Sequence, residues 1–185
     1  SNSIIAPLAA SQDSINNPPL YPFIGATFVK VFSSILSPHD AIRLSNFIWI
    51  SLTILSIGLM TRELWGPGFG RQAGLIFIAS IGLIFNVHTI RPEVSALLGF
   101  ALALYGFALY YRRPFRASLV LGFGISIIFL SSGILSLLSI FITSLTLLFI
   151  KQWRNKRYYL FCLISSIVAL SIISPWVRSE EHTSE

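Results

Sequence analysis

The segment His88-Thr-Ile-Arg-Pro-Glu93 carries an imidazole, a guanidinium and a carboxylate between two apolar stretches. A guanidinium binds phosphate through two parallel hydrogen bonds, so Arg91 beside an apolar wall suits the phosphate of a lipid carrier. Glu93 and His88 could hold a divalent metal ion or move a proton. Arg43, at the start of another apolar stretch, could point at the same anion. The spacing alone also fits a solvated loop with a local ion pair, and an Arg43 that reaches to the membrane surface.

The composition indicates that the lipid bilayer surrounds the elements that position these residues. Hydrophobic residues make up 54% of the chain and charged residues 11%, against about 25% charged in a soluble domain. The net charge of +6 does not indicate a nucleic-acid partner, because the basic residues lie in short clusters between apolar stretches. The single cysteine, Cys162, lies within an apolar stretch and is expected to pack as a small hydrophobic residue.

Six stretches are apolar enough to cross a bilayer as helices, at about 46–61, 73–90, 94–111, 117–133, 134–150 and 158–177. The fourth and fifth belong to one uncharged run of 32 residues, Leu119–Ile150. A single helix of that length would measure about 48 Å, well beyond a hydrocarbon core of about 30 Å. We therefore expect the chain to reverse near Ser131-Ser132-Gly133, where glycine permits a tight turn. Pro92 and the charges around it place the break between the second and third spans at the membrane surface.

The basic residues divide unequally between the two sides that this threading creates. Nine of them fall on one side: Arg62, Arg71, Arg112, Arg113, Arg116, Lys151, Arg154, Lys156 and Arg157. Three fall on the other side: Lys30, Arg43 and Arg91. Since cytoplasmic loops carry an excess of lysine and arginine, the side with nine is predicted to be cytoplasmic.

The region before the first span is predicted to lie on the outer face. Leu20–Leu36 contains Lys30 and follows two prolines, so a short amphipathic helix in the outer interface fits better than a span. Ser37 is then expected to cap the next helix, with Pro38 at its first position and Asp40 in its first turn. The predicted fold is thus all-α, with residues 1–45 forming an outer-face loop and interfacial helix and residues 46–177 forming six transmembrane helices.

Small residues recur every fourth position at Ser95, Gly99 and Ala103, and they predict a close approach by another helix. Arg178–Glu185, in contrast, departs sharply from the apolar run before it. This tail matches the in-frame translation of a common sequencing adapter. We expect residues 178–185 to be non-native and the chain to be an internal piece of a larger protein.

Several ordered motifs resemble one family of membrane enzymes. They are Asn17-Pro-Pro-Leu-Tyr-Pro-Phe23, Ala41-Ile-Arg43-Leu44, the basic turn Leu64-Trp-Gly-Pro-Gly-Phe-Gly-Arg71, Arg91-Pro92-Glu93, Gly124-Ile-Ser-Ile-Ile-Phe-Leu-Ser-Ser-Gly133 and Pro175-Trp176. In this order, over about residues 15–177, they resemble the GT-C membrane glycosyltransferases related to protein O-mannosyltransferases and bacterial lipid A aminoarabinose transferases. The resemblance implies an inverting transfer of a sugar from a polyprenyl-phosphate donor to a lipid, glycan or protein acceptor. It also implies a bacterial cytoplasmic membrane with the active face outward.

The resemblance assigns roles to a few residues only. Arg43 and Arg91 would bind the donor phosphate, and Glu93 would position the sugar or a divalent metal ion, the one cofactor expected; His88 has no firm counterpart in the family. The family's presumed general base, an aspartate in the first outer loop, would precede Ser1, so we expect the chain alone to be inactive. Two family lysines are replaced here, by Asn17 and Ser132, which removes charge near the expected phosphate.

Two other classes of protein remain as alternatives at this point. A transporter or permease subunit would use the charged outer loop as a gate, but it predicts ionisable groups at mid-membrane depth. None of the six predicted spans has a charged residue near its centre. A scaffolding membrane protein without chemistry predicts that His88, Arg91 and Glu93 splay apart.

Overall fold

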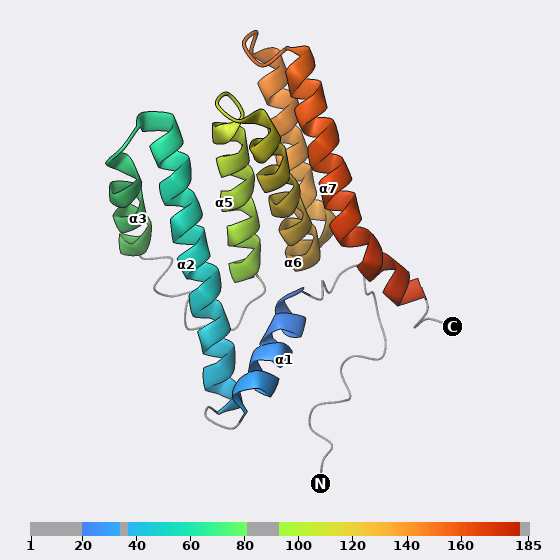
Figure 1. Cartoon of the computed structure of the whole chain (residues 1–185). Helices are drawn as coiled ribbons and strands as arrows, with labels where there is room; N and C mark the ends of the chain where they lie inside the picture. Colours follow the sequence, from blue (N-terminus) through green and yellow to red (C-terminus); the bar gives the residue numbers. More distant parts are fainter. Residues whose placement is uncertain (1–19, 34–36, 81–92, 182–185) are drawn as a thin grey trace.

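The computed structural model describes residues 20–33, 37–80 and 93–181, and within these ranges the only regular secondary structure is helical. The helices are α1 (Leu20–Phe32), α2 (Pro38–Trp65), α3 (Phe69–Ala79), α5 (Glu93–Leu109), α6 (Pro114–Phe149) and α7 (Lys156–Glu181). Figure 1 shows them side by side as a bundle, with α1 lying across the start of α2. The predicted all-α fold class is confirmed for this part of the chain.

Three helices in the described ranges are long and apolar enough to cross a membrane. They span Asp40–Trp65, Pro114–Phe149 and Lys156–Trp176, with mean hydropathies of 1.6, 2.4 and 1.9. Large apolar side chains such as Leu135 and Phe149 point away from the bundle, as side chains that face lipid do. The protein is therefore an integral membrane protein. Three shorter apolar helices accompany the long ones: α1, α3 and α5.

The predicted reversal at Gly133 is confirmed. Gly133 has φ 73° and ψ −168°, which interrupts the helical geometry of α6. In a straight helix, Leu121 and Ser144 would lie about 35 Å apart, yet both line one small cavity. The two halves of α6 therefore fold back on each other, and Tyr158 of α7 reaches the second half through a hydrogen bond of 2.9 Å to the Ser144 carbonyl.

The small residues of α5 form a close helix contact with backbone atoms on both sides. A Cβ atom placed on Gly99 would lie 2.9 Å from the backbone nitrogen of Ile128, and one on Gly124 would lie 2.8 Å from that of Ala103. Ser95 and Ala103 are fully buried. The prediction that this face of α5 receives another helix is confirmed, and α6 is that helix.

In the second predicted span, 73–90, the bounds of the helix differ from the prediction. Its helix, α3, begins at Phe69 and ends at Ala79, and Ser80 is extended with ψ 120°. The Ser80 hydroxyl donates a 2.7 Å hydrogen bond to the Phe77 carbonyl, and serine competes in this way with the helical pattern. Residues 81–90 lie outside the described ranges. The other predicted spans fall within α2, α5, α6 and α7 to within two residues.

The ends of the helices separate the charges as predicted. One end of the bundle carries the last turn of α2, the start of α3, and the turns between α5 and α6 and between α6 and α7, with the helix ends next to them (Figure 1). The nine basic residues predicted to be cytoplasmic lie here, and we call this the basic end. The opposite end, which we call the α1 end, carries α1 and the starts of α2 and α5. Lys30 and Arg43 lie there, and Arg91 lies outside the described residues.

Candidate functional site

The α1 end brings together the segments in which sequence analysis placed the site. Arg43 lies in the second turn of α2, and Glu93 is the first residue of α5. Both helices start toward this end, and α5 begins partway along α2 (Figure 1). His88, Arg91 and the side chain of Glu93 lie outside what the structure describes, so their contacts with one another stay predictions.

Arg43 is held near the start of α2 by a local network. The Ser37 hydroxyl accepts a hydrogen bond from the Asp40 backbone N–H at 3.3 Å and donates one to the Asp40 carboxylate at 2.7 Å. This confirms Ser37 as the N-terminal cap, with Pro38 at the first position of the helix. The other carboxylate oxygen of Asp40 lies 3.9 Å from the Arg43 guanidinium, whose side chain is 65% exposed. A weak surface pair of this kind leaves the guanidinium accessible to an anion.

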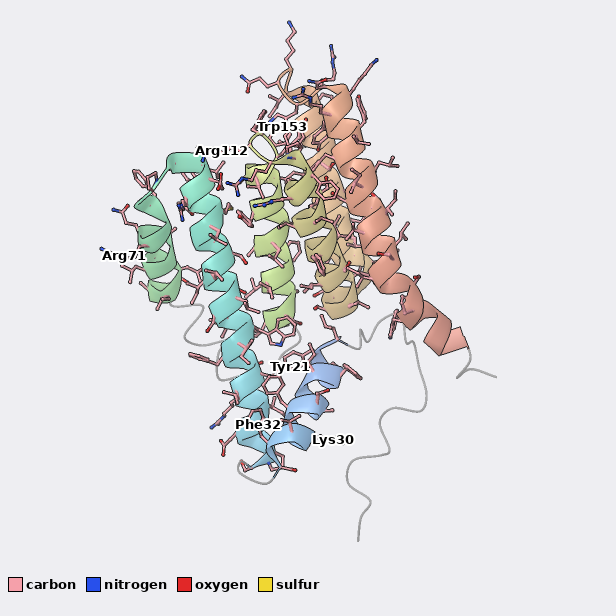
Figure 2. All side chains as sticks on the ribbon, viewed as in Figure 1. Tyr21, Lys30, Phe32, Arg71, Arg112 and Trp153 are labelled. Carbon is pink, nitrogen blue, oxygen red and sulfur yellow. The ribbon has the colours of Figure 1, made fainter. Side chains whose placement is uncertain are left out.

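A buried polar pair that sequence analysis missed fixes α1 against α2. The Tyr21 hydroxyl donates a 2.9 Å hydrogen bond to the Asn46 side-chain oxygen, and both residues are buried. Figure 2 shows Tyr21 on the face of α1 that meets α2. Tyr21 belongs to the proline-led motif 17–23, and Asn46 follows the motif 41–44, so the pair joins two segments that the resemblance had singled out separately. A local pattern could have flagged only Asn46, as a lone amide in an apolar stretch.

Asn46 lies next to the start of α5. Trp49, one helical turn further along the same face of α2, packs with Val94 and Leu98 of α5. Asn46 is 1% exposed, and its amide nitrogen has no hydrogen-bond partner among the described residues. A buried N–H donor without a partner is costly to folding.

The described residues give no test of the predicted metal ion. No three His, Cys, Asp or Glu side chains come together within 20–33, 37–80 and 93–181. The two residues predicted to position a metal, His88 and Glu93, are those whose side chains the structure leaves undescribed. Carboxylate and imidazole groups are suitable ligands for a divalent metal ion.

The basic end is built differently, around an aromatic cluster. The Trp153 ring stacks on that of Tyr110 with centroids 5.0 Å apart, and Phe107 and Tyr158 pack edge-on against Trp153. Figure 2 places Trp153 and Arg112 together at this end. Aromatic rings beside basic residues are typical of the interface between lipid and water. Tyr158 itself is 1% exposed, so it acts as a packing residue.

One ion pair at the basic end also escaped the sequence analysis. Arg112, in the turn after α5, lies 3.2 Å from the Glu63 carboxylate in the last turn of α2. The Glu63 oxygen in this pair makes no aligned hydrogen bond, so the contact is electrostatic. It joins α2 to the turn between α5 and α6.

A partly open cavity of about 260 Å³ lies between the two halves of α6 and α7, and Cys162, Ser144 and Ser165 line part of it. The Ser165 hydroxyl donates to the Phe161 carbonyl, and Ser144 bonds to Tyr158. These polar groups are satisfied within the bundle, and Cys162 is half-buried as predicted for a packing residue. The cavity offers no group free for chemistry.

Comparison of the chain with protein-family models, with curated proteins and with solved structures found no match. The candidate site therefore rests on the geometry of the α1 end and on the sequence motifs alone.

Proposed function

We propose that this chain forms part of a membrane glycosyltransferase that uses a polyprenyl-phosphate-linked sugar. One observation carries the proposal: the segments of three separate motifs meet at the α1 end. Tyr21 bonds to Asn46, Arg43 lies one turn before Asn46, and α5 begins beside it with Glu93. The motifs are separate in sequence, and the packing of α1 and α5 against α2 brings their segments together.

In this proposal the α1 end faces away from the cytoplasm. The chain crosses the membrane six times, through α2, the segment that includes α3, α5, the two halves of α6, and α7, and α1 lies in the outer interface. The nine basic residues at the basic end support this orientation, since cytoplasmic segments are enriched in lysine and arginine. The membrane is proposed to be the bacterial cytoplasmic membrane.

Arg43 and Arg91 would hold the donor phosphate. Glu93 and His88 would position the sugar, or a divalent metal ion that offsets the charge of the phosphate as it leaves. The exposure of Arg43 supports its part, because a guanidinium in a weak surface pair can exchange its partner. The acceptor attacks the anomeric carbon and gives its proton to the general base expected outside this chain. The bond between that carbon and the phosphate oxygen breaks, polyprenyl phosphate leaves, and the configuration inverts.

The first test measures donor binding to this chain in nanodiscs of phosphatidylcholine, with polyprenyl phosphate as the titrated probe. We expect Arg43→Gln and Arg91→Gln each to weaken binding about tenfold, since a charge-assisted hydrogen bond contributes about 1.5–3 kcal/mol. Arg154→Gln, at the basic end, is the matched control and should change binding less than twofold. Equal binding by all four proteins would overturn the placement of the phosphate.

The second test measures transfer itself. Membranes that contain the chain extended by its upstream coding sequence should move labelled sugar from a prenyl-linked donor, and Arg91→Gln should reduce the rate at least tenfold. The chain of 185 residues alone should show no transfer. Sugar transfer by this chain alone would contradict the expectation that the general base lies outside it.

A further inference from the structure

A groove between α2 and α3 has the shape and charge of a lipid site, and it lies at the basic end, away from the proposed donor site. Its volume is about 570 Å³, within the range of about 300–1,000 Å³ common for ligand pockets. Most of its lining is apolar, including Ile54, Leu59 and Ile78, and two arginines, Arg62 and Arg71, complete it. Figure 2 shows Arg71 on α3, the outermost helix of the view.

Glycines form the floor of this groove. A Cβ atom on Gly70 would lie 2.5 Å from the Gly58 carbonyl oxygen, and one on Gly74 would lie 3.4 Å from the Ile54 side chain. The backbones of α2 and α3 thus approach closely, while Leu75 remains 60% exposed on the wall. A shallow, largely apolar trough that is open on one side results.

The two arginines at the groove have no carboxylate to neutralise them within the described residues. The one acidic side chain near them in sequence, Glu63, lies against Arg112 instead. Arg62 and Arg71 are both exposed, and the turn Gly66-Pro67-Gly68 between their helices brings them to the same groove. An unneutralised pair of guanidiniums favours a phosphate, which accepts two hydrogen bonds from each.

We propose that this groove binds one anionic phospholipid, with the phosphate held between Arg62 and Arg71 and an acyl chain lying along the apolar trough. The position of the groove along the bundle agrees with this arrangement. The basic end marks the level of the lipid headgroups, and the trough runs from that end along α2 and α3. Basic pockets between transmembrane helices hold anionic headgroups elsewhere by the same electrostatics. The proposal does not depend on the glycosyltransferase activity.

The test is native mass spectrometry of the purified chain, titrated with dioleoyl phosphatidylglycerol and, separately, with dioleoyl phosphatidylcholine. We expect the first phosphatidylglycerol to bind at least tenfold more tightly than phosphatidylcholine. The double variant Arg62→Gln/Arg71→Gln should lose this preference. Lys151→Gln/Arg154→Gln removes the same charge from the same end and should keep it to within twofold.

A second variant, Leu75→Trp, narrows the trough without changing charge. It should weaken binding of phosphatidylglycerol several-fold, whereas inorganic phosphate at millimolar concentration should not displace the lipid from the original chain. An equal loss of preference in both charge variants would overturn the proposal in favour of diffuse attraction. Displacement by inorganic phosphate, an unchanged Leu75→Trp variant, or a dimer mass in place of the lipid adduct would also overturn it.

Discussion

Among the described residues, two pairs of helices meet with glycine against glycine, and they differ in how closely the helices pack beyond that contact. Along α5, the small residues Ser95, Gly99 and Ala103 form one continuous buried line against α6. Between α2 and α3 the closest contact is a single crossing of Gly58 and Gly70, and beside it the groove of about 570 Å³ remains open.

The difference indicates that the length of the repeat of small residues governs how closely two helices pack. The repeat extends over Ser95, Gly99 and Ala103 in α5, but only over Gly70 and Gly74 in α3. A repeat of four keeps small residues on one face over several turns, so two backbones can run together. A single crossing lets the helices diverge beyond it. The α5–α6 pair is therefore a structural unit, and the α2–α3 pair can serve as a binding surface.

Gly124→Ala should have the largest effect on this comparison. Its Cβ atom would lie 2.8 Å from both the Ala103 nitrogen and the Gly99 carbonyl oxygen, and backbone atoms on both sides cannot move aside. We expect the free energy of unfolding in detergent titrations to fall by about 2–3 kcal/mol. Gly74→Ala is the matched control, since its nearest neighbour, a side-chain methyl of Ile54, is 3.4 Å away. An equal loss in Gly74→Ala would remove the distinction between the pairs.

Gly133→Ala should have the second-largest effect and lower the free energy of unfolding by about 2 kcal/mol. The backbone at Gly133, with φ 73° and ψ −168°, lies in a region that is essentially restricted to glycine. The strain acts on the turn that returns the second half of α6 to the first, so the aromatic contact of Phe107 with Trp153 should persist. Tryptophan fluorescence and unfolding titrations measure the two effects separately. Stability equal to that of the original chain would mean that α6 does not reverse at this residue.

Gly70→Ala should displace α3 while changing the stability of the bundle by less than about 1 kcal/mol. The contact with Gly58, at 2.5 Å, is closer than the one at Gly124, at 2.8 Å, but α3 can tilt away because it contacts mainly α2. Spin labels at Leu55 and Leu75 should report a longer distance in the variant. A large loss of global stability with no change of distance would show that the α2–α3 pair is as rigid as the α5–α6 pair.

Arg112→Gln should have the smallest effect, because the Arg112 side chain is 65% exposed. Exposed ion pairs contribute about 0.2–1 kcal/mol and are screened by salt. This pair connects α2 to the turn after α5, so it couples the two helix pairs. We expect a loss of about 0.5 kcal/mol at low salt that disappears at 1 M salt. Arg113→Gln is the control, and a salt-independent loss in Arg112→Gln would contradict an electrostatic role.

Features set by neighbouring residues could be predicted from the sequence. The cap at Ser37 and Asp40 follows from side-chain reach within one turn, and the break at Gly133 follows from the length of an uncharged run between two basic clusters. The packing face of α5 follows from its repeat of four. Each of these depends on spacing along one segment, which the sequence displays directly.

Features that join distant segments could not be predicted in the same way. Tyr21 and Asn46 form a hydrogen bond across the contact between α1 and α2. Glu63 forms an ion pair with Arg112, although Arg62 and Arg71 are nearer to it in the sequence. Such choices depend on how helices pack. The end of α3 at Ala79 was missed because the apolar composition continues past it. The predicted roles of His88, Arg91 and Glu93 stay predictions.

The proposed function depends on the orientation of the bundle, and cysteine labelling tests it most directly. Cys162→Ala leaves no native thiol. On that background, Ser33→Cys marks the α1 end and Gln152→Cys marks the turn between α6 and α7; both positions are exposed. In spheroplasts, which are bacterial cells without the outer membrane but with the inner membrane intact, a membrane-impermeant maleimide should label Ser33→Cys at once. It should label Gln152→Cys only after the inner membrane is permeabilised. Labelling of both positions from the same side, or of Gln152→Cys alone in intact cells, would contradict the account.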